Sequence, residues 1–150
     1  MTHPFYQFTT STEALRFEFV SVGKQIIPKV VIFNATDLAN IYSLTLANLL
    51  PDGSLDDMTV SDNGDMEKIL STVFQCLSVF LKQRPESVAA FAGSTDVRTR
   101  LYRIAIAHEL QQAQERFSIW GLTNEVVELF RPNKAYQGFL ISLKSVNIDF

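Results

Sequence analysis

The hydrophobic pattern of this 150-residue chain changes its period at Asn63, and this change is the strongest constraint on the fold. Before it, apolar and polar residues alternate, as Phe17 and Phe19 do around Glu18, which is typical of half-buried strands. After it, apolar residues follow the i, i+3, i+4 spacing of an amphipathic helix until Pro85. Strands followed by helices predict an α+β domain.

The first part of the chain is predicted to form two hairpins. An alternating run at 15–19 leads through a turn to a second run at 26–33. Pro28 has no amide hydrogen to donate, so we expect it on a sheet edge or at a bulge. Residues 41–50 fit helical spacing as well as a strand, but the turn Pro51-Asp52-Gly53 favours a strand and a second hairpin.

Two helices and three strands are predicted in the rest of the chain. They are a helix from Asn63 or Asp62 as cap to before Pro85, a strand at 88–92, a helix at 96–116, a turn at 120–124, and strands at 126–130 and 139–143. We therefore predict one α+β domain over residues 1–150, with the order β-β-β-β-α-β-α-β-β. Its antiparallel or mixed sheet would have about six to eight strands backed by two helices.

Apolar residues at core-facing positions of these elements should form the interior. The expected core residues are Met66, Leu70, Val73, Phe74, Leu77 and Phe91, together with the phenylalanines 17, 19, 33 and 80. Further aromatic residues, Phe5, Tyr6, Phe8, Phe139 and Phe150, are expected to cover the sheet or to form a homodimer patch.

Composition indicates one globular domain and excludes a strongly basic protein. The chain is 47% hydrophobic and 19% charged, with a formal net charge of −3. Residues 1–75 hold 4 basic and 9 acidic side chains, and residues 76–150 hold 9 basic and 7 acidic ones. No overall positive field attracts phosphate backbones, so nucleic acid is not an expected partner. The uneven charge favours a surface of two signs and a protein partner.

The remaining composition signals place the protein in the cytoplasm, without a membrane anchor, metal or cofactor. Cys76 is the single cysteine, so an internal disulfide is excluded, and its apolar neighbours indicate a buried thiol. With only His3 and His108 beside it, the chain has no zinc-ligand spacing. The N-terminus lacks a signal-peptide pattern, and the longest apolar run, 88–92, is far too short to span a bilayer.

Two stretches of sequence carry a family resemblance. One is Ser61-Asp62-Asn63-Gly64-Asp65 before the first helix, and the other runs from Phe91 through Gly93-Ser94-Thr95 and Arg98-Thr99-Arg100-Leu101-Tyr102-Arg103. On these stretches the chain resembles a bacterial family of small single-domain proteins of unknown function. The resemblance covers nearly the whole chain. It implies no activity, substrate or catalytic residue, and the residues leave open whether the protein is an enzyme.

One segment is a candidate binding site for an anion such as phosphate or a nucleotide. Gly93, Ser94 and Thr95 lie between a buried strand and a helix, where small residues and free helix N–H groups accommodate an anion. Arg98, Arg100 and Tyr102 follow in the first turns, where the helix dipole disfavours cations. At 3.6 residues per turn Arg100 is rotated by roughly 200° from Arg98, so one small ligand cannot contact both.

The same residues also have a purely structural interpretation. Ser94 or Thr95 would be an N-cap, and the arginines would pair with carboxylates of the acidic segment 52–65. Two functions therefore stay open. The first is a non-enzymatic binding or interaction module of a regulatory or defence unit, with a protein partner or self-association. The second is a protein that binds a phosphate-containing small molecule through Gly93 to Tyr102.

Overall fold

The computed structural model describes residues 3–57, 63–144 and 146. The elements in these residues are β1 (Thr9–Thr10), β2 (Arg16–Val22), β3 (Ile26–Ala35), β4 (Ile41–Leu49), β5 (Leu55–Asp56), α1 (Met66–Gln83), β6 (Val88–Phe91), α2 (Asp96–Ala113), β7 (Phe117–Leu122), β8 (Val127–Leu129) and β9 (Gly138–Leu143).

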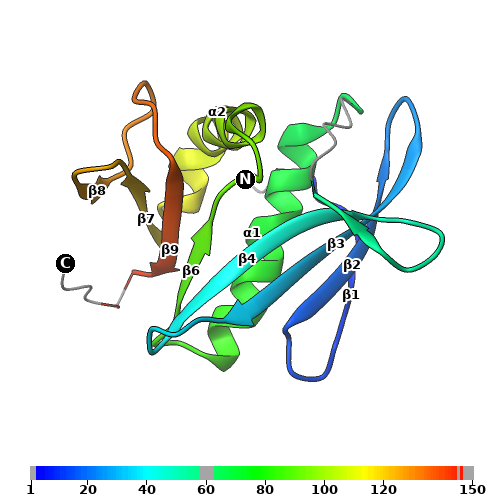
Figure 1. The fold of residues 1–150 in the computed structure, drawn as a ribbon, viewed down its shortest axis with the longest axis horizontal. Coiled ribbons are helices and arrows are strands. Elements are labelled where there is room, and N and C mark those ends of the chain that lie inside the picture. Colours follow the sequence, from blue (N-terminus) through cyan, green and yellow to red (C-terminus); the bar gives the residue numbers. More distant parts are fainter. Residues whose placement is uncertain (1–2, 58–62, 145, 147–150) are drawn as a thin grey trace.

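The strands form one mixed sheet with the order β1-β2-β3-β4-β6-β9-β7-β8, and β5 pairs with β4 beside this path. Every described pairing is antiparallel except that of β4 with β6. The parallel pair needs a long crossover, which α1 provides. Figure 1 shows β4 crossing in front of α1, with α2 beside the upper end of α1. The α+β class is confirmed.

Both predicted hairpins are present in the first half. β2 pairs with β3 from Arg16 opposite Ile32 to Val22 opposite Ile26, and β4 pairs with β5 across the turn that contains Gly53. Gly53 has a φ of 87°, a left-handed conformation that favours glycine. Pairing of β3 with β4 begins only at Lys29, so Pro28 lies where β3 has a neighbour on one side only.

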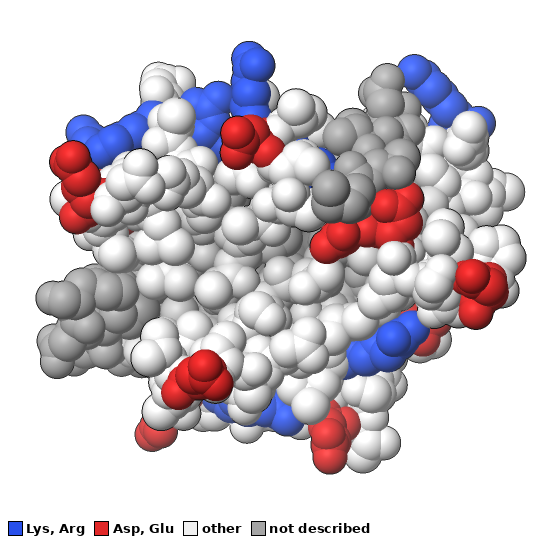
Figure 2. Space-filling model, viewed as in Figure 1, with Lys and Arg blue, Asp and Glu red and all other residues white. Residues whose placement is uncertain are grey.

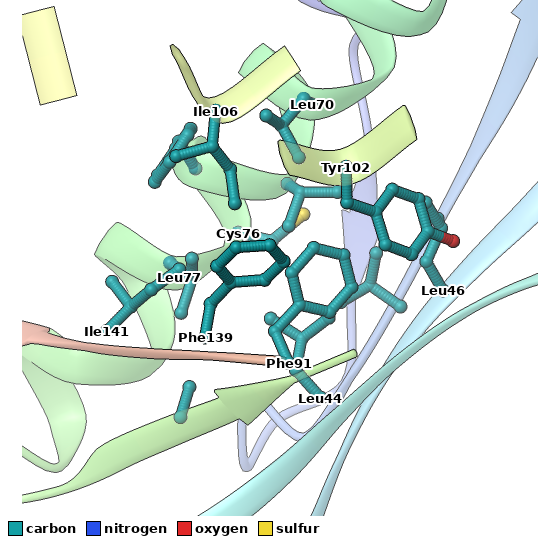
Figure 3. Packing of buried hydrophobic residues seen from close by; sticks show 14 of the residues in the cluster. Leu44, Leu46, Leu70, Cys76, Leu77, Phe91, Tyr102, Ile106, Phe139 and Ile141 are labelled. Atoms are coloured by element: carbon teal, nitrogen blue, oxygen red, sulfur yellow. The ribbon is translucent and has the colours of Figure 1, made fainter. Parts of the chain in front are cut away.

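The main core lies between α1 and the sheet. α1 buries an almost continuous face, and of the expected core residues Leu70, Val73, Phe74, Leu77 and Phe91 are at most 6% exposed. Met66 is only partly buried against the core. Figure 3 shows Leu77 and Cys76 from α1 beside Ile141 and Phe139 from β9, and Leu70 on the side of the cluster towards Tyr102.

The region after α2 differs most from the prediction. α2 ends at Ala113 rather than near 116, and residues 117–122 form the strand β7, where we expected a turn at 120–124. The residue that indicated a turn, Gly121, is paired inside this strand. It is a glycine because a Cβ there would lie 2.3 Å from a ring carbon of Tyr136. With the short β1, the described sheet has nine strands.

Two of the aromatic residues expected to cover the sheet or to form a homodimer patch are part of the interior. Tyr6 is 9% exposed and Phe139 is fully buried, since the N-terminal segment packs against α1 and β9 is an inner strand. Phe5 and Phe8 are partly buried. Phe150 lies outside the described residues.

Candidate functional site

Asn63 attaches the start of α1 to the β2–β3 hairpin. Its side-chain oxygen accepts from the Gln25 amide (2.7 Å), and its side-chain nitrogen donates to the Gln25 carbonyl and to Ser21 Oγ (both 2.9 Å). The hairpin can approach because Gly23 has no Cβ, which would lie 2.0 Å from the Asn63 carbonyl oxygen. Gly64, with a φ of 80°, then turns the chain into the helix.

Asp65 is the N-cap residue of α1, but its side chain does not cap the helix. Its Oδ2 atom accepts hydrogen bonds from the hydroxyls of Tyr6 and Ser21, each at 2.5 Å. Burial, and then the hydrogen bond to Asp65, raise the pKa of Tyr6. The prediction of Asn63 as cap is wrong because that side chain is bound to the hairpin, and Asp62 lies outside the described residues.

The junction between β6 and α2 is tight. A Cβ on Gly93 would lie 2.5 Å from the backbone nitrogen of Thr99, so glycine allows the strand end to approach the first helical turn. Thr95 is the N-cap of α2, and its hydroxyl oxygen accepts from the backbone N–H of Arg98 at 3.2 Å. Thr95 thus has the capping role of the structural interpretation.

Arg98 is buried, with only 5% of its surface exposed. Its guanidinium donates to the Tyr102 hydroxyl (2.8 Å), to the Leu46 carbonyl of β4 (3.3 Å) and to the Asp57 carbonyl. Tyr102 stacks on Phe91 of β6 with ring centroids 4.5 Å apart, and Figure 3 shows the two rings side by side. Arg98 therefore connects α2 to β4 and to the segment after β5.

A cavity of about 840 Å³ lies between the first turns of α1 and α2. Its lining residues include Lys29, Leu46, Asp65, Met66, Ile69, Val97, Arg98, Leu101 and Tyr102. Two cationic side chains from distant parts of the sequence, Lys29 of β3 and Arg98 of α2, thus contribute to one cavity. Asn63, Glu67 and Lys68 line it as well, and apolar atoms make up the larger part of the wall surface.

Lys29 is the second buried cation of this cavity, at 4% exposure. Its ammonium donates to Asn48 Oδ1 on β4 at 2.6 Å. Burial lowers the pKa of Lys29 to about 8, and repulsion by Arg98 contributes, although Asp65 and Asp56 attract the ammonium. A lysine with this pKa is still mostly charged at neutral pH, and its charge is destabilised by its surroundings.

The six predicted site residues divide between two different hollows. Arg98 and Tyr102 line the cavity, whereas Gly93, Ser94, Thr95 and Arg100 line a groove of about 550 Å³. Arg98 and Arg100 lie in different hollows, as their angular separation on a helix predicts. The sequence prediction therefore joins residues that the fold separates.

Lys29 is the residue of this site that sequence reasoning missed. It has the same strand parity as Val31 and Phe33, which are core residues. A lysine on the inward face of an alternating strand is rare because burying its charge is costly. The parity is visible in the sequence, but its meeting with Arg98 depends on how α2 packs against the sheet.

Cys76 is fully buried, as predicted, and burial raises the pKa of its thiol. Within residues 3–57, 63–144 and 146, no group of three or more His, Cys, Asp or Glu side chains is arranged to hold a metal ion. Neither described helix is long and apolar enough to cross a membrane.

Comparison with known proteins identifies a family but no activity. No curated protein and no solved structure matches the chain. A family profile described as "Family of unknown function (DUF6934)" matches residues 2–144. Since the match covers almost the entire sequence, the chain belongs to this family of unknown function, DUF6934.

Proposed function

We propose that this protein binds a small organic anion, carrying a carboxylate or phosphate group, in the cavity between the starts of α1 and α2. One observation carries the proposal: two buried cationic side chains, Lys29 and Arg98, line the same cavity. Perturbed ionisable groups that line a cavity are more often found at functional sites than elsewhere.

The energetics of the two cations support a ligand of negative charge. Burying Lys29 near Arg98 disfavours its charged form, as its lowered pKa indicates. An anion between them would replace repulsion by charge-assisted attraction to the Lys29 ammonium and the Arg98 guanidinium. Such a ligand would therefore offset the free-energy cost of burying the two positive charges.

The size and walls of the cavity indicate more than an inorganic ion. Its volume of about 840 Å³ is in the range of small-molecule sites. Leu46, Ile69, Val97 and Leu101 provide apolar surface beside the cations. We therefore expect a ligand with an anionic group for Lys29 and Arg98 and an apolar body, such as an aromatic ring or a short acyl chain, for these walls.

A thermal-shift screen tests the proposal. Phosphate, mono- and dinucleotides, and aromatic and aliphatic carboxylates are added to the parent protein and to Lys29→Met. A ligand at a hundredfold excess over its Kd should stabilise the parent by about 2.7 kcal/mol, and Lys29→Met should lose most of this gain. Lys24→Met, which changes an exposed lysine, is the matched control and should keep it. A screen without a stabilising anion, or equal gains in both lysine variants, would contradict the proposal.

The affinity for the anion should also depend on pH. Because the pKa of Lys29 is about 8 and an anion favours the charged ammonium, the Kd should rise as the pH increases through 8. Isothermal titration between pH 7 and pH 9 in the parent protein measures this rise. Lys29→Met should show a weaker and flatter profile.

A second candidate function is partner binding through the sheet. Figure 2 shows that the face turned away from α1 is mostly uncharged and is hollowed at its centre. At one end of this region the β2–β3 hairpin exposes Val20, Val22 and Ile26, at 43%, 58% and 74%. Light scattering across a range of concentrations tests for self-association, which Val22→Lys should reduce. A monomer at all concentrations would contradict the self-association.

A further inference from the structure

We propose a second binding site, in the groove between the start of α2 and residues 135–137, that takes an acidic segment of a protein partner. This groove of about 550 Å³ is lined by Gly93, Ser94, Thr95, Asp96, Thr99, Arg100 and Arg103 on one side and by Ala135, Tyr136 and Gln137 on the other. It shares no lining residue with the cavity of Lys29 and Arg98. The proposal therefore stands independently of the proposed function.

Two arginines of the groove lack partners within the described part of the chain. Arg100 is exposed and Arg103 is half-buried, and neither makes a hydrogen bond or an ion pair there. Both lie in the N-terminal half of α2, and Arg100 is in the second turn, where the helix dipole does not favour a cation. At a spacing of three residues their side chains lie on one side of the helix.

The surroundings of the groove extend its positive charge. Across it, Glu128 accepts hydrogen bonds from Arg131 (2.9 Å), Lys134 (2.7 Å) and Tyr136 (2.7 Å), so one carboxylate is shared by two cations. These bonds lower the pKa of Glu128 to about 2. In Figure 2, Lys and Arg side chains gather along the upper left edge, over α2 and the connection from β8 to β9. With Asp96, the four basic groups face two acidic ones.

The occupant that fits best is an extended acidic polypeptide rather than a compact phosphate. The hydroxyl donors at the start of α2 are already engaged, since Ser94 donates to the Asp57 carbonyl and Thr99 to the Thr95 carbonyl. The Thr95 hydroxyl already caps the helix. The basic groups are instead spread along an open surface, where a series of carboxylates meets them one after another.

Fluorescence anisotropy with a labelled oligo-glutamate peptide tests this site. The parent protein should bind the peptide at low salt, and affinity should fall steeply with added NaCl, because exposed charges are screened. The double variant Arg100→Glu, Arg103→Glu should bind about tenfold more weakly or worse, since two attractions become repulsions. Arg16→Glu, at a partly exposed arginine of β2 that pairs with Glu18, is a single charge-reversal control and should bind nearly as the parent does.

Two further measurements separate this site from its alternatives. Lys29→Met, which changes the other cavity, should leave oligo-glutamate binding intact. Inorganic pyrophosphate should weaken peptide binding no more than NaCl of the same ionic strength does. Absence of peptide binding by the parent, equal binding by the double variant, or tight and specific displacement by pyrophosphate would overturn the proposal. Circular dichroism of the double variant checks that a loss of binding is not a loss of folding.

Discussion

The two helices have the same length, 18 residues, but their buried positions differ in kind. α1 lies centrally, and its buried residues are mainly large and apolar. α2 lies beside α1, and its buried residues are both apolar and polar. Tyr102, Ala105, Ile106 and Ala113 belong to the core, whereas Arg98, Thr99 and Glu109 are polar. The comparison indicates that α1 contributes the larger apolar face to the core, whereas α2 adds a smaller one and also places Arg98 in the cavity and Thr99 in the groove.

Truncating α1 should have the largest effect on stability. Leu70 is 1% exposed and belongs to the core cluster, so Leu70→Ala removes buried methyl groups and leaves a cavity. We expect a loss of about 2 to 5 kcal/mol in the free energy of unfolding. Urea denaturation followed by circular dichroism measures this loss. A change below about 0.5 kcal/mol would contradict the assignment of α1 as the core helix.

Removing the Arg98 side chain from α2 should lower the stability less than Leu70→Ala does, and through lost hydrogen bonds rather than a cavity. Arg98→Ala removes the donor to the Leu46 and Asp57 carbonyls and to Tyr102, and buried acceptors without donors are costly. We expect a loss of about 1 to 3 kcal/mol, partly offset because Lys29 is relieved of repulsion. Urea denaturation of Arg98→Ala, beside that of Leu70→Ala, measures this loss. A loss well above about 3 kcal/mol would show that Arg98 supports the fold by more than these hydrogen bonds.

The contrast between the helices also explains what the sequence could predict. The period change at Asn63 and the spacing along α1 identify the core, because a continuous apolar face is a local property. β7 was not predicted because a glycine is a local turn signal. At 121 the glycine instead makes room for the ring of Tyr136, fifteen residues later, and this contact is not visible in the sequence. In the same way, the position of Asn63 in the sequence is typical of a helix cap. Its side chain binds the β2–β3 hairpin instead, and only the tertiary structure shows this.

The candidate site could be predicted only in part for the same reason. The arginines of α2 were recognisable because they oppose the helix dipole, and helical geometry separated Arg98 from Arg100. Which hollow each one faces is decided by contacts with β4 and with residues 135–137, which are distant in sequence. Lys29 joins Arg98 only through tertiary packing.

Measuring the unfolding free energy as a function of pH tests whether the buried charge of Lys29 destabilises the fold. The folded pKa of Lys29, about 8, is lower than the unfolded value near 10.5, so the unfolded state binds more protons between these values. The penalty is therefore fully present below about pH 8 and is relieved as the pH rises towards 10.5. Between pH 7 and pH 9 the unfolding free energy of the parent should rise relative to that of Lys29→Met. Parallel profiles of the two proteins would contradict a destabilised charge at Lys29.

The smallest expected effect comes from Arg100, two residues after Arg98 on the same helix. Arg100 is exposed and has no hydrogen bond or ion pair among the described residues, so Arg100→Ala breaks no native contact of that kind. Alanine favours a helix slightly more than arginine does, and the change removes a cation from the unfavourable half of the dipole. The unfolding free energy should therefore change by no more than about 0.5 kcal/mol, with a gain rather than a loss. Thermal and urea denaturation beside Arg98→Ala measure the difference between the two arginines. A loss of about 1 kcal/mol or more would show that Arg100 supports the fold, and the groove would then lose one of the two cations offered to a partner.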